Sequence, residues 1–244
     1  MSKMACRYIR IPVLGMLCAV AAFPAAAQVA PPLGQAGSFA VLGGTTVTNT
    51  GATIVTGDVG VSPGTAITGF PPGTLSGTMH SNDAVAQGAQ SDLATAYNAL
   101  ASQACNTDLT GTDLGGLTLT SAVYCFSSTA QLTGTLTLDA QGNPNAVFVF
   151  QIGSALTTAS AANVLVINGG SDCNVFWQAG SSATLGTGSG FVGNILALAS
   201  ITLTTSATSH GSLLARNGAV TMDTNQIGVC TPTTPVTLQS FDVD

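Results

Sequence analysis

A short pattern recurs in the second half of the chain at a nearly constant spacing. Each copy runs from a small residue through an apolar residue and a threonine to a second apolar residue, and the copies are 182–187, 200–205 and 219–224. The second apolar residues, Leu185, Leu203 and Met222, follow one another at steps of 18 and 19 residues. A repeat of this length, with short strands and Gly at the corners, is typical of a β-solenoid, whose stacked turns bury one shared core.

Alternation with a period of two extends the strand prediction over most of the remaining chain. Residues 132–138 alternate Leu or Gly with Thr, and 117–120 repeat Leu-Thr. Such alternation indicates strands with one face buried. We therefore expect looser turns around Leu132 and Leu156 and a first turn at 46–48. The expected inward ladder consists of Leu156, Leu185, Leu203 and Met222.

One segment, 81–104, is predicted to be a long helix. It contains no Pro and a single Gly, and its apolar residues recur at three- and four-residue steps. Ser81 or Asn82 can cap its start, and Asp83 suits the positive end of the helix dipole. A helix of this length would run roughly 36 Å, enough to lie along several turns and seal one apolar face. The apolar stripe comprises Val85, Ala89, Leu93, Ala96, Tyr97 and Leu100.

The segment before this helix lacks any period. Residues 61–80 are rich in Gly and Pro. We expect them to form a loop that caps an open end of the solenoid, because a bare end would template edge-to-edge aggregation.

The first 27 residues have the pattern of a secretory signal. A basic start with Lys3, Arg7 and Arg10 precedes an apolar stretch and the small residues Ala25-Ala26-Ala27. A retained membrane anchor is the alternative, although the apolar stretch is short for a bilayer. Cleavage would leave 28–230 as the folded domain and 231–244 as a linker-like C-terminal tail. The protein is then expected outside the cell, either free or associated with the cell surface.

Signal cleavage would also remove Cys6 and Cys18 and leave four cysteines in an exported chain. An even count in that setting predicts two disulfides, but four cysteines allow three pairings. We favour Cys105–Cys125, which would tie the helix end to the next strand, and Cys173–Cys230, which would tie the C-terminal end to the body. No Cys or His spacing resembles a zinc site.

The charge composition argues against binding to nucleic acid. Charged residues make up 6 % of the chain, with ten acidic and four basic residues. Three of the basic residues lie in the first ten positions, so beyond them the chain keeps one cation, Arg216. Nucleic acid needs clustered Lys and Arg, so we expect no nucleic-acid partner.

Two motifs that resemble catalytic or nucleotide-binding sequences lack the right context. The GxSxG match at 60–64 is not followed by a helix, as a nucleophile elbow requires. The GxGxxG match at 188–193 is followed by a predicted strand, so no helix N-terminus faces a phosphate. The Asp residues are scattered rather than paired for acid–base chemistry. We therefore expect no enzyme activity, no catalytic residue, no metal site and no cofactor.

The outward faces of the repeated strands carry small hydroxyl-bearing and methyl-bearing residues. If Val47, Ala183, Ile201 and Val220 point inward, their neighbours point outward. The resulting candidate face consists of Thr46, Thr48, Thr129, Gln131, Ser182, Thr184, Ser200, Thr202, Ala219 and Thr221. A second outward column would hold Thr133, Thr157 and Thr204.

The plain explanation is that Thr is a good residue for an exposed strand. The near absence of charge indicates that this face has a further role, because most soluble protein surfaces use long charged side chains for solvation. A rigid lattice of methyls and hydroxyls can order water and match a crystalline solid, especially ice. We therefore predict a surface that binds ice.

Several motifs, in the same order, resemble the secreted microbial ice-binding family of the DUF3494 type over 33–230. They are LGQAGSFAVL at 33–42, GDVGVSPG at 57–64, AVFVFQI at 146–152, NVFWQ at 174–178 and GNILA at 193–197. The resemblance implies a discontinuous right-handed β-helix of triangular cross-section with a long α-helix alongside. It also implies adsorption to ice through one flat face, with thermal hysteresis and inhibition of ice recrystallisation.

The family's face often carries T-A/G-x-T/N units, and this chain departs from them. The counterparts are 45–48, 181–184, 199–202 and 218–221, which keep the final Thr but have Thr at the first position only once. We expect a monomer whose partner is the ice surface, with no membrane contact after signal cleavage. The alternative is a cell-surface adhesin or matrix module that binds polysaccharide.

Overall fold

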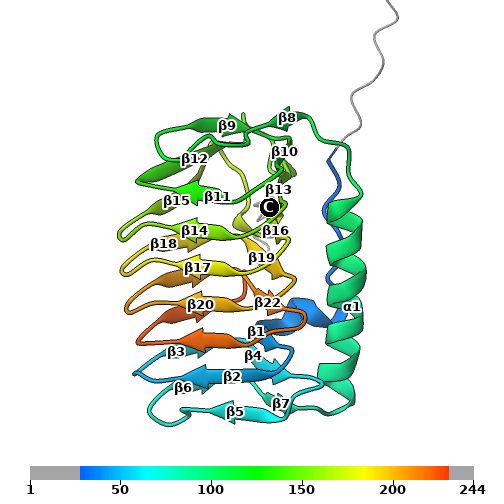
Figure 1. The fold of residues 1–244 in the computed structure, drawn as a ribbon, viewed down its shortest axis with the longest axis vertical. Helices are drawn as coiled ribbons and strands as arrows, with labels where there is room; N and C mark the ends of the chain where they lie inside the picture. The colour runs from blue at the N-terminus through cyan, green and yellow to red at the C-terminus, as the bar shows by residue number, and fades with distance from the viewer. Residues whose placement is uncertain (1–27, 231–244) are drawn as a thin grey trace, which may run out of the picture.

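The computed structural model describes residues 28–230, and these form a three-sided β-helix with one α-helix alongside (Figure 1). The predicted signal (1–27) and tail (231–244) lie outside the described residues. All strand pairs are parallel, and a complete turn contributes one strand to each of three sheets. The mainly β solenoid predicted from the repeat is confirmed. No helix within 28–230 is long and apolar enough to cross a membrane.

Sheet A has nine strands and lies beside the helix. In spatial order they are β7 (Met79–Ser81), β4 (Asp58–Val61), β1 (Phe39–Gly43), β22 (Leu213–Ala215), β19 (Asn194–Ala197), β16 (Val175–Ala179), β13 (Phe148–Ile152), β10 (Val123–Phe126) and β8 (Thr107–Asp108).

Sheets B and C form the other two sides. Sheet B has seven strands: β11 (Ala130–Leu132), β14 (Leu156–Thr158), β17 (Ala183–Leu185), β20 (Ile201–Leu203), β23 (Val220–Met222), β2 (Thr46–Asn49) and β5 (Ala66–Thr68). Sheet C has eight: β6 (Thr74–Ser76), β3 (Ile54–Thr56), β24 (Gln226–Gly228), β21 (Thr208–His210), β18 (Gly190–Val192), β15 (Asn163–Ile167), β12 (Thr135–Asp139) and β9 (Thr118–Thr120). Two 3₁₀ helices complete the structure, η1 (Gly34–Ser38) and η2 (Asp172–Asn174).

The chain does not wind continuously from one end to the other. Strands β1 to β7 form the turns at one end, and α1 (Ala84–Ala101) then carries the chain to the opposite end. From β8 onward the chain winds back until its last turn stacks on its first (Figure 1). The seam between first and last turns pairs β1 with β22, β2 with β23 and β3 with β24.

Helix α1 is shorter than the sequence suggests. It covers 18 residues rather than the whole of 81–104, which corresponds to about 27 Å. Its N-cap is Asp83, whose side chain accepts a hydrogen bond from the Ala86 amide. Ser81, one of the predicted caps, is instead the last residue of β7. Val85 is 40 % exposed, and the buried side of the helix starts at Ala86.

The segment 61–80 differs from the predicted loop. It forms an additional turn, in which β5, β6 and β7 each become the end strand of their sheet. These strands are three residues long and are separated by Gly and Pro, so they are too short to show a period in the sequence. The segment still covers one end of the β-helix.

The interior of the β-helix holds a stack of aromatic rings. Phe150 and Trp177 lie 3.9 Å apart between ring centroids and 9° from parallel, with Tyr124 and Phe191 on either side. Trp177 is fully buried, and its Nε1 donates a hydrogen bond to the Val192 carbonyl at 3.0 Å. The apolar sequence around Trp177 predicts that this residue belongs to the core, and the prediction is confirmed.

The inward ladder of sheet B needs one correction in register. Leu185 pairs with Leu203, but Leu156 pairs with Ala183, which lies two residues before Leu185. The predicted alignment of Leu156 with Leu185 is therefore wrong by two residues, although both side chains are buried as predicted. The reason is that β14 continues with Leu-Thr-Thr, where the later turns have apolar-Thr-apolar.

Both favoured disulfides are present. Cys105, just after α1, is bonded to Cys125 in β10. Cys173 in η2 is bonded to Cys230, the last described residue. Each bond joins segments that are distant along the chain but adjacent in the fold.

Candidate functional site: the outward face of sheet B

The structure brings all ten predicted face residues to one sheet. Six of them lie within its strands: Thr46, Thr48, Gln131, Thr184, Thr202 and Thr221. The other four stand directly before a strand: Thr129, Ser182, Ser200 and Ala219. Their neighbours Val47, Ala183, Ile201 and Val220 are fully buried, as expected for the inward positions.

The strand register aligns seven outward residues into one column, which we call the middle column. It runs across all seven strands of sheet B as Gln131, Thr157, Thr184, Thr202, Thr221, Thr48 and Thr68. Neighbouring members therefore lie about 4.8 Å apart, the separation of hydrogen-bonded strands. Six of the seven carry a Thr side chain.

Two members of the middle column were missed by the sequence analysis. Thr157 was expected in a second column with Thr133 and Thr204, but it pairs with Gln131 and Thr184. The register of the Leu-Thr-Thr strand could not be read from its own residues. Thr68 lies in the segment predicted to be a loop, and its pairing with Thr48 reveals its place.

A second column stands two residues before the middle column in each turn, and we call it the leading column. It contains Thr129, Ala155, Ser182, Ser200, Ala219, Thr46 and Ala66. Outward residues two positions apart in a strand are separated by about 6.6 Å. The two columns thus form a regular grid of small side chains.

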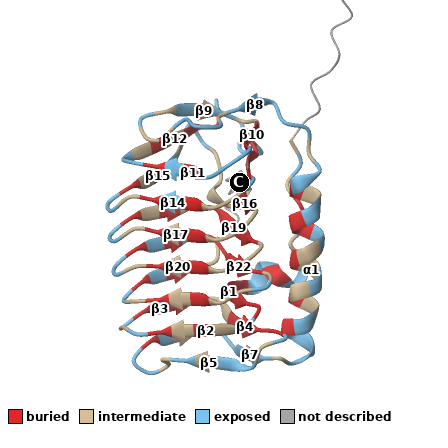
Figure 2. Cartoon of the chain, viewed as in Figure 1, coloured by how far each residue is buried: buried red, intermediate tan, exposed pale blue. Residues whose placement is uncertain are grey.

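The grid carries no formal charge. Neither column contains Lys, Arg, Asp or Glu. Asp113 forms an isolated bridge with Gln131 just beyond the end of the middle column, and Asp223 follows β23 at the corner toward sheet C. The pKa of Asp223 is lowered by hydrogen bonds from the Thr205 side chain and then from Thr224. The strands below the grid alternate between buried and intermediate residues (Figure 2).

Sheet A cannot offer a comparable surface because α1 covers it. The helix residues Ala89, Leu93 and Leu100 are fully buried in a cluster with Phe39 and Leu196 of sheet A (Figure 2). The side that faces α1 is therefore part of the hydrophobic core.

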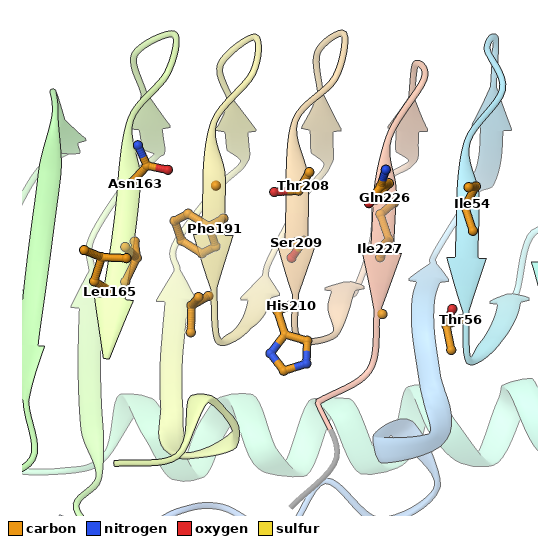
Figure 3. Close-up of a pocket in the computed structure, with 14 residues that line it drawn as sticks. Ile54, Thr56, Asn163, Leu165, Phe191, Thr208, Ser209, His210, Gln226 and Ile227 are labelled. Atoms are coloured by element: carbon orange, nitrogen blue, oxygen red, sulfur yellow. The ribbon is translucent and has the colours of Figure 1, made fainter. Parts of the chain in front are cut away.

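Sheet C is exposed but uneven. Gly190 sits between Asn163 and Thr208 in one outward column, and Gly228 sits between His210 and Thr56 in the next. These glycines help to form a groove of about 520 Å³ across β15, β18, β21, β24 and β3 (Figure 3). Ile54 and Leu165, each 51 % exposed, stand at its rim. A hollowed surface cannot lie flush on a crystal plane.

In the described residues, the serine of the GxSxG match and the two histidines have local hydrogen-bond partners. Within 28–230, no group of three or more His, Cys, Asp or Glu could hold a metal ion. The GxSxG serine, Ser62, donates to Asn82 Oδ1 at 3.0 Å, and β5 follows it rather than a helix. His80 and His210 each pair with one aspartate, Asp83 and Asp172, at 2.8 Å.

Comparisons with known proteins agree with this geometry. The family model described as Ice-binding-like matches residues 41–228. An ice-binding protein from Nostoc sp. (strain HG1) is 61 % identical over 204 residues, covering 83 % of this chain and 76 % of the relative. Ice-binding protein 1 from Shewanella frigidimarina is 33 % identical, and its match covers 82 % of this chain but only 26 % of that longer protein.

A solved structure has the same fold. The crystal structure of an ice-binding protein from an Antarctic biological consortium superposes with a TM-score of 0.81 at 48 % sequence identity. The match covers 83 % of this chain and 92 % of the other. With the family model spanning most of the described residues, the chain belongs to the Ice-binding-like family.

Proposed function

We propose that this protein binds ice by placing the outward face of sheet B against the crystal. The observation that carries the proposal is the middle column, which keeps one strand register across seven strands and contains no charged residue. Of the three sides, it is the one that is neither covered by α1 nor hollowed by a groove.

The physical basis is a match between a stiff grid and ordered water. Methyl groups of Thr hold water in cages, and hydroxyls anchor those cages by hydrogen bonds. The grid is rigid because its inward residues are fully buried, so adsorption costs little conformational entropy. Ice that grows between adsorbed molecules must curve, which lowers its freezing temperature below its melting temperature and slows recrystallisation.

The setting we propose is outside the cell. Residues 1–27 have the pattern of an export signal, and two disulfides within 28–230 suit an oxidising compartment. The protein acts there as a monomer, since one molecule presents the whole face. It has no catalytic role. The polysaccharide-binding alternative gains no support from the relatives, which are ice-binding proteins.

A pair of matched substitutions tests the face. Thr202→Tyr and Thr184→Tyr place a bulky ring at the centre of the middle column, where both residues are part of one register. Thr208→Tyr makes the same change on an exposed strand of sheet C and serves as the control. We expect the two sheet B variants to lose most thermal hysteresis and the control to retain it.

The result would be read together with the unfolding temperature of each variant. All three side chains point outward, so all three variants are expected to fold. Unchanged hysteresis in both sheet B variants, or loss only in Thr208→Tyr, would show that another side of the molecule contacts ice.

A further inference from the structure

The serine hydroxyls of the leading column are occupied by the protein's own backbone. The Ser200 amide donates a hydrogen bond to Ser182 Oγ at 3.3 Å, and the Ala219 amide donates to Ser200 Oγ at 3.1 Å. Each serine hydroxyl thus accepts a hydrogen bond from the backbone amide of the leading-column residue in the next turn. These bonds replace backbone acceptors at the corner between sheets A and B, where a buried amide needs a partner.

The backbone above Ser200 is shaped to keep its hydroxyl in that position. A Cβ atom on Gly218 would lie 2.3 Å from Ser200 Oγ, so only glycine leaves room for the hydroxyl there. The Ser200 hydroxyl therefore lies between two turns of the β-helix rather than standing free on the face. It acts as a spacer that connects stacked turns.

Hydroxyls at the opposite edge of sheet B are occupied in the same way. Thr204 Oγ1 donates to the Leu185 carbonyl at 2.9 Å, and Thr50 Oγ1 donates to the Met222 carbonyl at 3.3 Å. Asp223 accepts from the hydroxyls of Thr205 and Thr224. Along β17, β20 and β23, the polar groups at both edges of the face are thus bonded within the protein.

The centre of the middle column differs from both edges. Within 28–230, the hydroxyls of Thr48, Thr184, Thr202 and Thr221 have no hydrogen-bond partner. All four residues are of intermediate exposure, and Ser189 Oγ is the one buried side-chain polar atom in the described residues that lacks a partner. The four threonine hydroxyls are therefore open to water.

We infer that ice recognition on this face is carried by the single row Thr184, Thr202, Thr221 and Thr48, and that Ser182 and Ser200 are positioning residues that hold the turns in register. The inference rests on the proposed function, and it narrows the proposed ice-binding residues from two columns to one row of four threonines. A hydroxyl whose oxygen already accepts a bond from a backbone amide has one acceptor position fewer to offer to ordered water. The free row has both groups that anchored cages need, a methyl and an unpaired hydroxyl.

The test compares alanine substitutions in the two columns, measured for thermal hysteresis and for unfolding temperature. Ser182→Ala and Ser200→Ala each remove an acceptor from a backbone amide, so each should lower the unfolding temperature by about 2–4 °C. Their hysteresis, measured near 0 °C where both remain folded, should fall far less than that of the threonine variants. Thr184→Ala and Thr202→Ala should show the opposite pattern, with hysteresis reduced and unfolding temperature nearly unchanged.

Two outcomes would overturn the inference while leaving the proposed function intact. One is loss of hysteresis in the serine variants equal to that in the threonine variants, with no fall in unfolding temperature. The other is full hysteresis in both threonine-to-alanine variants while Thr202→Tyr is inactive, since the face would then act through flatness alone. Full hysteresis in Thr202→Tyr would instead reject the proposed face itself.

Discussion

At the scale of single residues, position relative to the strand decides what a side chain does. Thr202 and Ser200 are two residues apart, yet one presents a free hydroxyl and the other accepts a bond from a neighbouring turn. Both were predicted as face residues because the period of two places them outward. The sequence does not show where a hydroxyl finds its partner, because that depends on the stacking of the next turn.

Buried residues were more predictable than the details of the face. Trp177 was assigned to the core because it lies in an apolar strand, and it is fully buried. Thr157 was misplaced because its strand contains two adjacent threonines and one leucine, which fit either register. Burial follows from composition, whereas register requires the neighbouring strands.

Replacing Trp177 tests the aromatic stack in the core. Trp177→Ala would remove the ring that packs against Phe150 and Phe191 and should cost about 3–5 kcal/mol of unfolding free energy. Trp177→Phe should cost about 1–3 kcal/mol, because it leaves the Val192 carbonyl without its donor. Urea unfolding followed by circular dichroism measures both. Equal stability of the Ala variant and the unsubstituted protein would contradict the buried stack.

At the scale of elements, α1 was the easiest to predict and its ends were the hardest. The stripe through Leu93, Ala96 and Leu100 marks its buried side because these residues recur at helical spacing. Its start was placed too early because residues 79–81 form β7, an end strand recognisable only from its pairing with β4. Short strands bounded by Gly and Pro leave no periodic signal.

The contacts of α1 explain why it stays on sheet A. Tyr97 donates its hydroxyl to the Ala179 carbonyl at 3.2 Å and accepts from Gln178 at 2.7 Å. At the C-terminal end, Gln151 Nε2 donates to the carbonyls of Leu100 and Gln103, at 2.7 and 2.8 Å. These bonds satisfy polar groups that the apolar contacts would otherwise bury unpaired.

The N-cap of α1 makes part of the stability depend on pH. The backbone hydrogen bond from Ala86 and then the side-chain bond with His80 lower the pKa of Asp83. A carboxylate with a lowered folded pKa stabilises the fold above its ordinary pKa, near 4, and loses that contribution as pH falls through the folded value. We therefore expect acidification below about pH 4 to lower the unfolding temperature less in Asp83→Asn than in the unsubstituted protein. Identical acid sensitivity of the two proteins would contradict this role.

At the scale of the whole molecule, the discontinuous winding places the last turn of the chain inside the stack rather than at its end. In a simple solenoid the last turn is terminal and contacts one neighbour. Here the last turn is internal, because β23 pairs with both β20 and β2. Local repeats predicted the solenoid but not this order. The resemblance to a known family implied it, since no local pattern specifies which turns become neighbours.

The seam predicts a distinctive pattern of backbone protection. Amides of β22 and β23 should exchange with solvent deuterium as slowly as those of β16 and β17, because both pairs of strands have neighbours on each side. Native-state hydrogen exchange measures this directly. A steady rise in exchange rate from β16 toward β24 would indicate an ordinary solenoid end at the C-terminal turn.

The regular grid on sheet B, which contains no charged residue, is the feature on which the functional account depends. The most direct measurement is the growth of one ice crystal in purified protein, cooled slowly below the melting point. The account predicts a faceted crystal that stops growing over a measurable temperature interval, and an interval that nearly vanishes with Thr202→Tyr but persists with Thr208→Tyr. A round crystal that grows as soon as it is cooled below its melting point in the unsubstituted protein would contradict it.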